Sequence, residues 1–322
     1  MANFLTVENS LSASGPPGRT GSLKKSPSAN IFVNPIAGGG KCSKKYRTVV
    51  HKLREAGVVC NVMTSQYPGH ITRVASELAA RGHKTFIACG GDGTVNELIN
   101  GIAGTETAMG IVPLGTGNDF ATNMGISKDI NLACAIIKER RVKEIDLVRV
   151  NDDRFFAGVG CLGFDAEVAA FAGRKRKDGS NPFLLHIMGG ILKFVSYKPK
   201  TVELRFDGHR YFGDIFLVAF GNTRTYARGM MITPQAVSDD ASLDICVVRK
   251  MPRWKILSIF PSVYKGAHLN SEEITLHRAG AVYVQSMKPM DLYADGDFMT
   301  TTPFRLEVVP KYLKVIVAPS SS

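Results

Sequence analysis

Residues 87–98 read IACGGDGTVNEL, and this stretch decides how the first half of the chain folds. The apolar run 85–89 predicts a short buried strand, and the glycines after it can take backbone conformations that other residues avoid. Thr94 is the expected N-cap of a helix whose free N–H groups favour phosphate. Asp92 disfavours a bare phosphate, so a bridging cation is the expected third partner. The stretch predicts a site for a metal-bound polyphosphate; the alternative is a tight turn in which Asp92 bonds only the backbone.

Composition limits the class of protein. At 322 residues the chain can bury two cores, and 44% hydrophobic with 21% charged residues is typical of a soluble globular protein. The net charge of +12 attracts polyanions such as nucleotide phosphates, anionic membranes and nucleic acid. Zinc-finger spacing, RNP-like strands and basic heptads are missing, so nucleic acid is not an expected partner. The six cysteines are scattered without a CxxC pair, which predicts a cytoplasmic protein with reduced thiols.

The N-terminal segment and the longest apolar run bear on membrane association. Residues 1–28 are rich in Ser, Gly, Pro and Lys and lack the apolar core of a signal peptide, so we predict a disordered tail. The longest apolar stretch, 183–197, is shorter than the roughly 20 residues that a membrane-spanning helix needs. We therefore expect a soluble or peripheral membrane protein.

Strand and helix patterns alternate between residues 30 and 140. Apolar runs at 31–33, 58–64, 85–89 and 109–112 are separated by helical patterns at 43–56, 71–81 and after Thr94. This order predicts a mostly parallel sheet, whose ligands bind outside the carboxyl ends of the strands. The loops after Val33, Cys89 and Val112, with Thr64 after the second strand, are therefore expected to meet in one crevice. The glycine loop 36–41 is not a P-loop, because the GxxxxGK[ST] spacing fails there.

From about residue 144 the pattern changes to short alternating segments. Turn signals such as Asp207-Gly208 separate them, which predicts a β sandwich or barrel. We expect strands at 145–151, 154–160, 201–206, 210–221, 243–248, 281–285, 292–294 and 304–317. Three helices are expected at 165–172, 183–195 and 254–263. The boundary between the two domains is placed near residue 147, with the first domain at 29–147 and the second at 148–319.

Three features of the second half can carry chemistry. The basic loop 173–179, GRKRKDG, is either a solvated turn or a contact for an anionic membrane. The acidic turn 233–244, TPQAVSDDASLD, either holds a hard cation or ends a strand. The late turn 293–297, YADGD, is a hairpin tip that needs no function, but in a phosphate enzyme one of its carboxylates could accept a hydroxyl proton.

These motifs, taken in order, resemble the diacylglycerol kinase catalytic-domain family, which shares its fold with sphingosine and ceramide kinases. The resemblance covers residues 29–319. GGDGT alone also occurs in NAD kinases, whereas its combination with GTGNDFA at 115–121 is much more specific. The motifs that carry the resemblance are Asn34-Pro35 with Gly38, Thr64 before Gly69-His70, GGDGTVNE at 90–97, PLGTGNDFA at 113–121, the acidic turn and Asp295-Gly296.

The resemblance implies roles for individual residues. Asp92 and Asp119 would organise a catalytic Mg²⁺, and Asp92 with the late carboxylates Asp295 and Asp297 forms the expected catalytic set. ATP would bind Asn34, Pro35, Ile36, Ala37, Gly38, Thr64, Gly90, Gly91, Asp92, Gly93, Thr94, Val95, Asn96 and Thr116. A second, structural Mg²⁺ would bind the Asp240 carboxylate and the carbonyls of Val237 and Ser242.

Two positions depart from the family pattern. Asp297 stands where the family has Glu, which makes Asp295 the preferred base. Ala241 stands where the family usually has Gly, so cation binding at the acidic turn is expected to be weaker if that turn needs a positive φ.

We therefore expect an ATP- and Mg²⁺-dependent kinase of a lipid hydroxyl, most simply converting diacylglycerol to phosphatidic acid. Alternatives are a kinase of a sphingoid base, ceramide or phosphatidylglycerol, a NAD kinase-like enzyme, and a catalytically silent lipid-binding protein. Residues 174–177, with Arg249, Lys250, Arg253 and Lys255, would dock a cytoplasmic, peripheral enzyme on anionic lipid. The helix 183–195 either lines an acyl-chain cleft or simply packs on the sheet.

Overall fold

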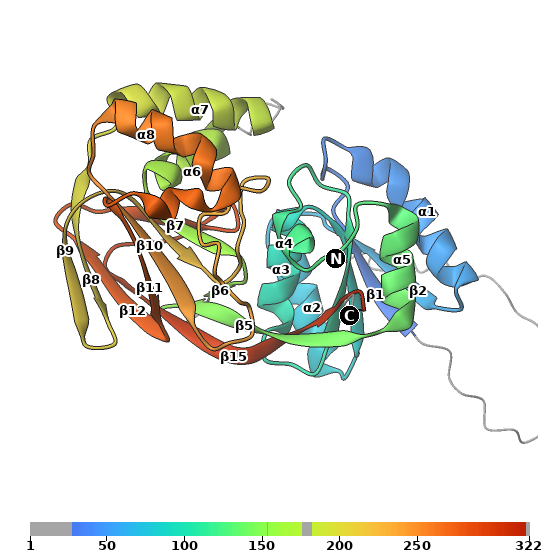
Figure 1. Cartoon of the computed structure of the whole chain (residues 1–322). Helices are drawn as coiled ribbons and strands as arrows, with labels where there is room; N and C mark the ends of the chain where they lie inside the picture. Colours follow the sequence, from blue (N-terminus) through green and yellow to red (C-terminus); the bar gives the residue numbers. More distant parts are fainter. Residues whose placement is uncertain (1–27, 153, 176–181, 320–322) are drawn as a thin grey trace, which may run out of the picture.

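The chain forms two lobes, which are joined along one edge by long strands (Figure 1). A computed structural model describes residues 28–152, 154–175 and 182–319, without the side chains of residues 174–187. Most of the expected N-terminal tail and most of the basic loop 173–179 therefore lie outside the described residues. The predicted fold class is confirmed, because an α/β lobe precedes a β-sandwich lobe.

The first lobe is a parallel sheet in the order β4-β3-β1-β2 with helices on both faces (Figure 1). All six residues of β3 are buried, as expected for a central strand covered on both sides. The strands are β1 (Ser28–Val33), β2 (Val59–Thr64), β3 (Thr85–Gly90) and β4 (Ala108–Pro113). The helices are α1 (Lys41–Glu55), α2 (His70–Ala80), α3 (Asp92–Ile102), α4 (Asp119–Asn123) and α5 (Ile130–Glu139).

The start of α3 differs from the sequence prediction. Thr94 does not cap the helix, since α3 begins at Asp92 with Gly91 as its N-cap. The Thr94 side chain is buried, and it fills the space that a Cβ atom on Gly90 would need. An aspartate at the first helical position is favourable because its charge opposes the positive end of the helix dipole. The phosphate turn is therefore shorter than predicted.

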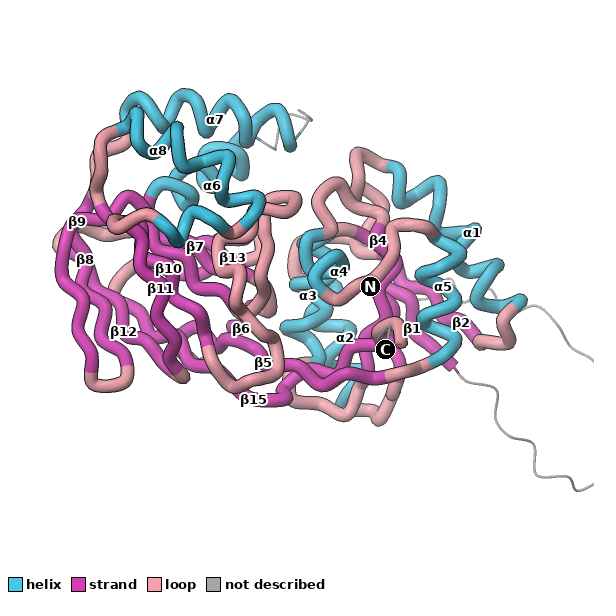
Figure 2. The backbone as a smooth tube through the Cα atoms, in the orientation of Figure 1, coloured by secondary structure: helices cyan, strands magenta, loops and turns pink. Residues whose placement is uncertain are grey.

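The second lobe is built from antiparallel strands, with its helices gathered on one side (Figure 2). The sequence pattern missed β11 and β14, which are short strands with many polar or half-exposed residues. The strands are β6 (Arg154–Phe156), β7 (Val159–Gly163), β8 (Lys200–Phe206), β9 (His209–Gly221), β10 (Leu243–Arg249), β11 (Ile274–Ala279), β12 (Ala281–Ser286), β13 (Asp291–Ala294) and β14 (Asp297–Thr301). The helices are α6 (Phe164–Lys175), α7 (Pro182–Ser196) and α8 (Arg253–Ile259), with 3₁₀ turns at Phe260–Lys265 and Ala267–Asn270.

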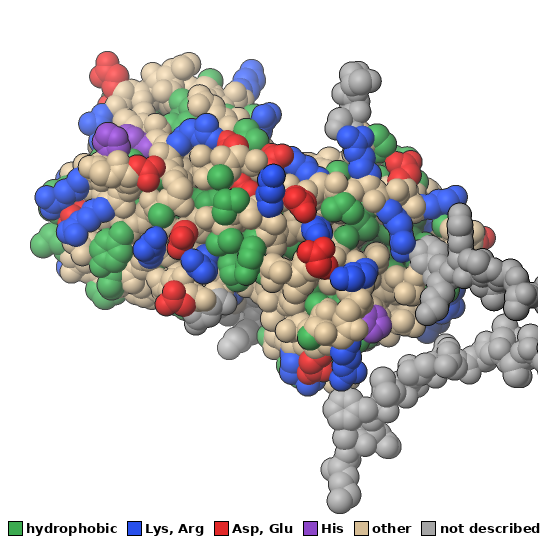
Figure 3. Space-filling view, turned by 90° about the horizontal axis from the view of Figure 1, so that it is seen from below, with side chains coloured by type: hydrophobic (Ala, Val, Ile, Leu, Met, Phe, Trp, Pro, Cys, Tyr) green, Lys and Arg blue, Asp and Glu red, His purple; other side chains and the backbone are tan. Residues whose placement is uncertain are grey.

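Two strands, β5 (Val142–Val150) and β15 (Phe304–Ile316), run through both lobes as an antiparallel pair. The first part of β15 pairs with β12 of the sandwich, and its last part pairs in parallel with β4. Leu306 accordingly packs in the core of the second lobe, whereas Leu313 and Val315 pack in the core of the first. The sheet is thus continuous between the lobes. Seen from below, this side carries charged side chains of both signs (Figure 3).

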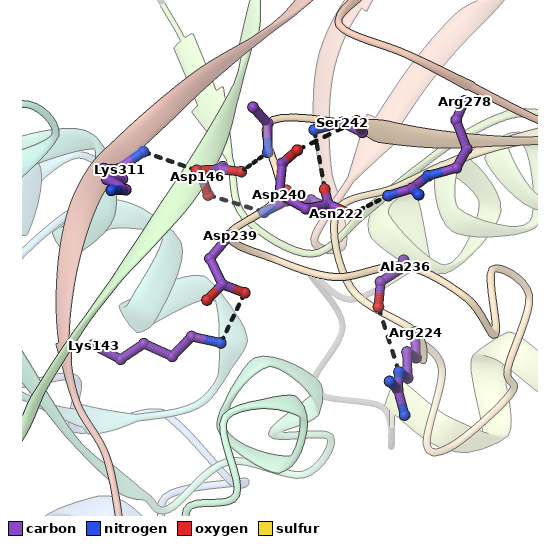
Figure 4. A network of polar contacts seen from close by, with 11 residues as sticks. Lys143, Asp146, Asn222, Arg224, Ala236, Asp239, Asp240, Ser242, Arg278 and Lys311 are labelled. Carbon is purple, nitrogen blue, oxygen red and sulfur yellow. Dashed lines mark hydrogen bonds and ion pairs between the residues drawn. The ribbon is translucent and has the colours of Figure 1, made fainter.

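Asp146 on β5 holds three segments together at the junction between the lobes. Its side chain is buried, and its carboxylate accepts hydrogen bonds from the N–H groups of Lys311 (2.8 Å) and Ala241 (2.7 Å) (Figure 4). Lys311, with φ +52°, lies where the register of β15 shifts. Asn222 completes the cluster by donating to the carbonyl oxygen of Asp146 at 2.9 Å. This acidic residue in the mostly apolar run 145–150 is a signal that we did not interpret from the sequence.

Replacing Asp146 should destabilise the whole chain. Asp146→Ala leaves two backbone N–H groups without their acceptor, and each unsatisfied buried donor costs about 1–3 kcal/mol. We expect a clear fall in the free energy of unfolding, measured by urea titration followed by circular dichroism. The exposed hairpin variant Asp207→Asn should change it by less than about 0.5 kcal/mol. Equal stability of the two variants would contradict the role of Asp146.

Candidate active site

Three loops of the first lobe meet at the carboxyl ends of β1, β3 and β4. The carbonyl oxygen of Gly90 accepts hydrogen bonds from the N–H groups of Leu114 (2.8 Å) and Gly115 (3.1 Å). A Cβ atom on Gly115 would lie 2.3 Å from the Cα atom of Gly91. One on Gly38 would lie 2.4 Å from the carbonyl oxygen of Leu114. Glycine is required at these positions because another backbone segment occupies the space of a side chain.

Asp92 holds the third of these loops in place. Its Oδ2 accepts the N–H of Asn118 at 2.7 Å, and its Oδ1 accepts the N–H of Phe120 at 3.3 Å. Both donors lie at the start of α4, where backbone N–H groups have no acceptor within the helix. Asp92 therefore bonds the backbone of a different loop rather than of its own turn. This contact links the GGDGT motif to the GTGNDFA motif.

Asp119 lies beside Asp92 across Gly117. A Cβ atom on Gly117 would lie 2.8 Å from Oδ2 of Asp92 and 3.6 Å from Oδ2 of Asp119, so the missing side chain leaves this space open. Burial, followed by the charge of Asp92, raises the pKa of Asp119, and a hydrogen bond from the Arg228 N–H partly opposes this. A divalent cation would favour both ionised carboxylates. The pair fits such an ion, with water or phosphate oxygens completing its shell, since the described residues contain no cluster of three His, Cys, Asp or Glu suited to a metal.

The β13–β14 hairpin of the second lobe brings two more carboxylates to these loops. Oδ2 of Asp297 accepts a hydrogen bond from Nδ2 of Asn96 on α3 at 3.0 Å. The charge of Asp92 is among the influences that raise the pKa of Asp295. Asp295 precedes Asp297 by two residues at the turn of this hairpin. The structure thus brings the hairpin of the second lobe, through Asp297, to the helix that begins at Asp92.

Asp295 is engaged with the backbone of residues 157–159. Its carboxylate accepts the N–H groups of Ala157 (2.9 Å), Gly158 (3.1 Å) and Val159 (3.2 Å). Burial is the largest influence on its pKa and raises it to about 6, while these hydrogen bonds lower it in part. The N–H of Gly158 is shared between both oxygens, so each carboxylate oxygen accepts two hydrogen bonds, which matches its two lone pairs. Asp295 therefore fixes the loop between β6 and β7.

The expected nucleotide-binding residues differ in accessibility. Ile36 is 75% exposed, and its N–H is bonded by the side chain of Asn34. Thr64 lies beside Val33 at the end of the neighbouring strand, as expected. Thr94 and Val95 are buried, so α3 would offer a ligand its first-turn backbone N–H groups rather than these side chains.

The loop that follows β9 contributes residues that the sequence did not reveal. The N–H of Arg228 donates to Oδ1 of Asp119 at 2.8 Å, and its guanidinium donates to the carbonyl oxygen of Thr116 at 3.3 Å. Asn123 donates to the carbonyl oxygen of Thr225 at 2.8 Å. Arg228 and Thr225 follow no recognisable motif, because their roles depend on how the two lobes face each other.

The acidic turn is arranged differently from the structural cation site that the resemblance implies. One Asp240 oxygen pairs with Arg278 and the other accepts the N–H of Ser242 (Figure 4). Ala241 has φ +59°, a conformation that favours glycine. Val237 is partly exposed. The carboxylate on which cation binding would depend is already neutralised by an arginine, so these residues do not fit the ion.

Comparison with known proteins agrees with this geometry. The diacylglycerol kinase catalytic domain family matches residues 28–150, and the YegS C-terminal NAD kinase beta sandwich-like domain family matches residues 158–317. A diacylglycerol kinase of Mycobacterium tuberculosis is 32% identical over 292 residues, which cover 88% of this chain and 93% of that protein. A diacylglycerol kinase of Bacillus subtilis is 27% identical, and the match covers 90% of this chain and 96% of that protein. A solved diacylglycerol kinase structure from Bacillus anthracis has a TM-score of 0.71 at 21% identity, with 92% and 98% covered, which shows the shared fold.

The chain therefore belongs to the diacylglycerol kinase catalytic-domain family. It is an ATP-dependent lipid kinase.

The contact between the two glycine loops can be tested directly. Gly115→Ala places a Cβ atom against the backbone of Gly91, and overpacking of this kind costs about 1–3 kcal/mol. We expect a lower melting temperature and weaker ATP binding, measured by differential scanning fluorimetry with and without nucleotide. Gly280→Ala is the matched control for stability, because a Cβ atom there meets nothing within 4 Å. A Gly115→Ala protein as stable as Gly280→Ala would contradict the close contact.

Proposed function

We propose that this enzyme transfers the γ-phosphoryl group of ATP to the hydroxyl of diacylglycerol, forming phosphatidic acid in a Mg²⁺-dependent reaction. The observation that carries the proposal is the group of carboxylates from both lobes around the glycine loops. The names of the relatives support diacylglycerol as the acceptor. A sphingoid base, ceramide or phosphatidylglycerol would require the same chemistry at the hydroxyl, so these remain the alternative acceptors.

Phosphoryl transfer depends mainly on positioning and on neutralising charge. The loops at 34–38, 90–96 and 114–118 would hold ATP through backbone N–H groups at the start of α3 and through Thr116. Asp92 and Asp119 would hold Mg²⁺, which neutralises phosphate charge when bound. Asp92 keeps the two loops in register through its bonds to Asn118 and Phe120.

Asp297 is the proton acceptor that the hydrogen bonds favour, in place of the Asp295 preferred from the sequence. A general base needs a lone pair within reach of the hydroxyl proton. The carboxylate of Asp295 accepts hydrogen bonds from three backbone N–H groups, whereas among the described residues the side chain of Asp297 accepts one, from Asn96 through Oδ2. Asn96 would orient Asp297, and Asp295 would position the loop next to it.

Paired variants separate the two roles. Asp297→Asn should lower kcat by about 10²–10⁴-fold, the usual contribution of a general base, while the melting temperature changes little. Asp295→Asn should lower both the melting temperature and kcat, because the amide cannot accept every backbone hydrogen bond. Steady-state kinetics and thermal melts of both proteins are the measurements. The assignment would be reversed by two results together. Asp297→Asn would keep full activity, and Asp295→Asn would lose activity while its stability stays unchanged.

A product assay tests the function itself. The protein is incubated with Mg²⁺, γ-labelled ATP and a total lipid extract, and the labelled product is separated and identified. Labelled phosphatidic acid supports the proposal; another labelled lipid identifies a different acceptor. Transfer to NAD instead of lipid would establish a NAD kinase-like activity, and transfer to no acceptor would favour a silent lipid-binding protein.

We also propose that the enzyme works in the cytoplasm at the surface of an anionic membrane, where its lipid substrate lies. None of the described helices has the length and apolar character needed to cross a bilayer. Among the basic residues expected to dock on lipid, Lys250 pairs with Asp214 and Lys255 pairs with Glu273. The side chains of residues 174–177 lie outside the described part of the chain. Charge alone is therefore a weak basis for docking.

A further inference from the structure

Helix α7 presents an apolar stripe to the outside of the molecule. Met188, Ile191, Leu192 and Val195 lie at positions i, i+3, i+4 and i+7, which share one helix face, and all four are exposed, Val195 to 69%. The opposite side of α7 is also apolar. Phe194 packs on Phe164 and Phe216 of the second lobe. Lys193 on α7 also pairs with Glu167 of that lobe. The outer stripe of α7 has no covering element among the described residues, although apolar helix faces are expected to be buried.

A second stripe lies on the neighbouring helix. Trp254 and Leu257 on α8, with Phe260 and Tyr264 on the 3₁₀ turn after it, are all exposed, Trp254 to 69%. The guanidinium of Arg253 donates to the carbonyl oxygen of Val195 at 2.8 Å, which fixes the start of α8 at the end of α7. The two helices lie together on the same side of the lobe (Figure 1). We call the two stripes together the α7/α8 face.

The chemistry of the α7/α8 face matches a lipid surface. Soluble proteins rarely leave this much contiguous apolar surface exposed without using it for binding. Trp and Tyr beside Leu, Ile and Phe are typical of segments that lie in the interface of a bilayer. The flanking segment 249–271 contains five Lys or Arg residues and no Asp or Glu, and two of the five, Lys250 and Lys255, pair with acidic residues outside it. The other three, Arg249, Arg253 and Lys265, would repel their counterparts in a second copy of this chain, but they would attract anionic headgroups.

We propose that the α7/α8 face inserts its apolar side chains into the interface of an anionic bilayer and so places the site on the lipid substrate. This inference rests on the proposed function, because it supplies the surface on which the kinase meets its acceptor. It assigns the outer stripe of α7 to membrane contact rather than to an acyl-chain cleft.

Tryptophan fluorescence gives a direct test, since Trp254 is the only tryptophan in the 322 residues. Vesicles of phosphatidylcholine with phosphatidylglycerol should shift its emission to shorter wavelength, and brominated acyl chains should quench it. Leu257→Glu should abolish vesicle binding, measured by co-sedimentation. Leu132→Glu is the matched control, because Leu132 is 57% exposed on α5 compared with 60% for Leu257, and it should bind vesicles as the unmodified protein does.

Activity measurements separate this inference from the proposed function. Leu257→Glu should lose most of the activity on vesicles but keep its turnover of short-chain diacylglycerol in detergent micelles. Vesicle binding without a shift or quenching of Trp254 would overturn the inference even if the kinase is active. A concentration-dependent dimer that Leu257→Glu disrupts in sedimentation velocity would also overturn it, because a second copy would then cover this face. An enzyme that binds vesicles through Trp254 but phosphorylates no lipid would refute only the proposed function.

A separate observation concerns Arg278 on β11. Its guanidinium pairs with Asp240, and its Nε lies 3.0 Å from Oδ1 of Asp244 on β10. The Asp244 side chain is 1% exposed, so this ion pair supplies the counter-charge for a buried carboxylate. Two carboxylates thus share one fixed cation of the chain itself.

We infer that Arg278 replaces the structural divalent cation of the β lobe, so that the folding of this lobe needs no metal. Chelation with EDTA should leave the melting temperature of the nucleotide-free protein unchanged. Arg278→Met should lower the melting temperature by several degrees, because it leaves two carboxylates without their counter-charge. A melting temperature that falls on chelation, with the fall abolished by Asp240→Asn, would overturn the inference. An Arg278→Met protein of unchanged stability would overturn it as well.

Discussion

The antiparallel pairing of β5 with β15 is the interaction on which the rest of the structure depends. Because β15 also pairs with β12 in one lobe and with β4 in the other, the two lobes share a continuous hydrogen-bonded sheet. Asp146 locks the register shift in β15 through the N–H of Lys311. The relative placement of the lobes, and so the approach of Asp297 to Asn96, follows from this pair of strands.

The site itself is made mostly by backbone. Glycines let three loops touch, and aspartates then fix the loops by accepting backbone N–H groups, as Asp92 does for α4 and Asp295 does for residues 157–159. Carboxylates used in this way carry negative charge into a partly buried space, which is why the pKa of Asp119 is raised. Carboxylates placed in this way would favour a bound divalent cation.

The sequence predicted what depends on local pattern. The parallel sheet, the positions of the glycine loops and the change to β structure near residue 144 could be predicted because strand, turn and helix signals lie within a few residues of each other. The predicted start of α3 was wrong, because Thr94 is buried in the core and does not cap the helix. Arg228 and Arg278 could not be found, because their partners are distant in sequence and depend on tertiary packing.

The most direct test of the central claim, that carboxylates of both lobes surround one phosphoryl-transfer site, is a crystal structure with Mg²⁺ and a non-hydrolysable ATP analogue. We expect a metal ion bound at Asp92 and Asp119, directly at about 2.1 Å or through water. The terminal phosphate should lie at the start of α3 and face Asp297. A nucleotide bound away from the glycine loops, or a terminal phosphate facing away from the β13–β14 hairpin, would contradict this account.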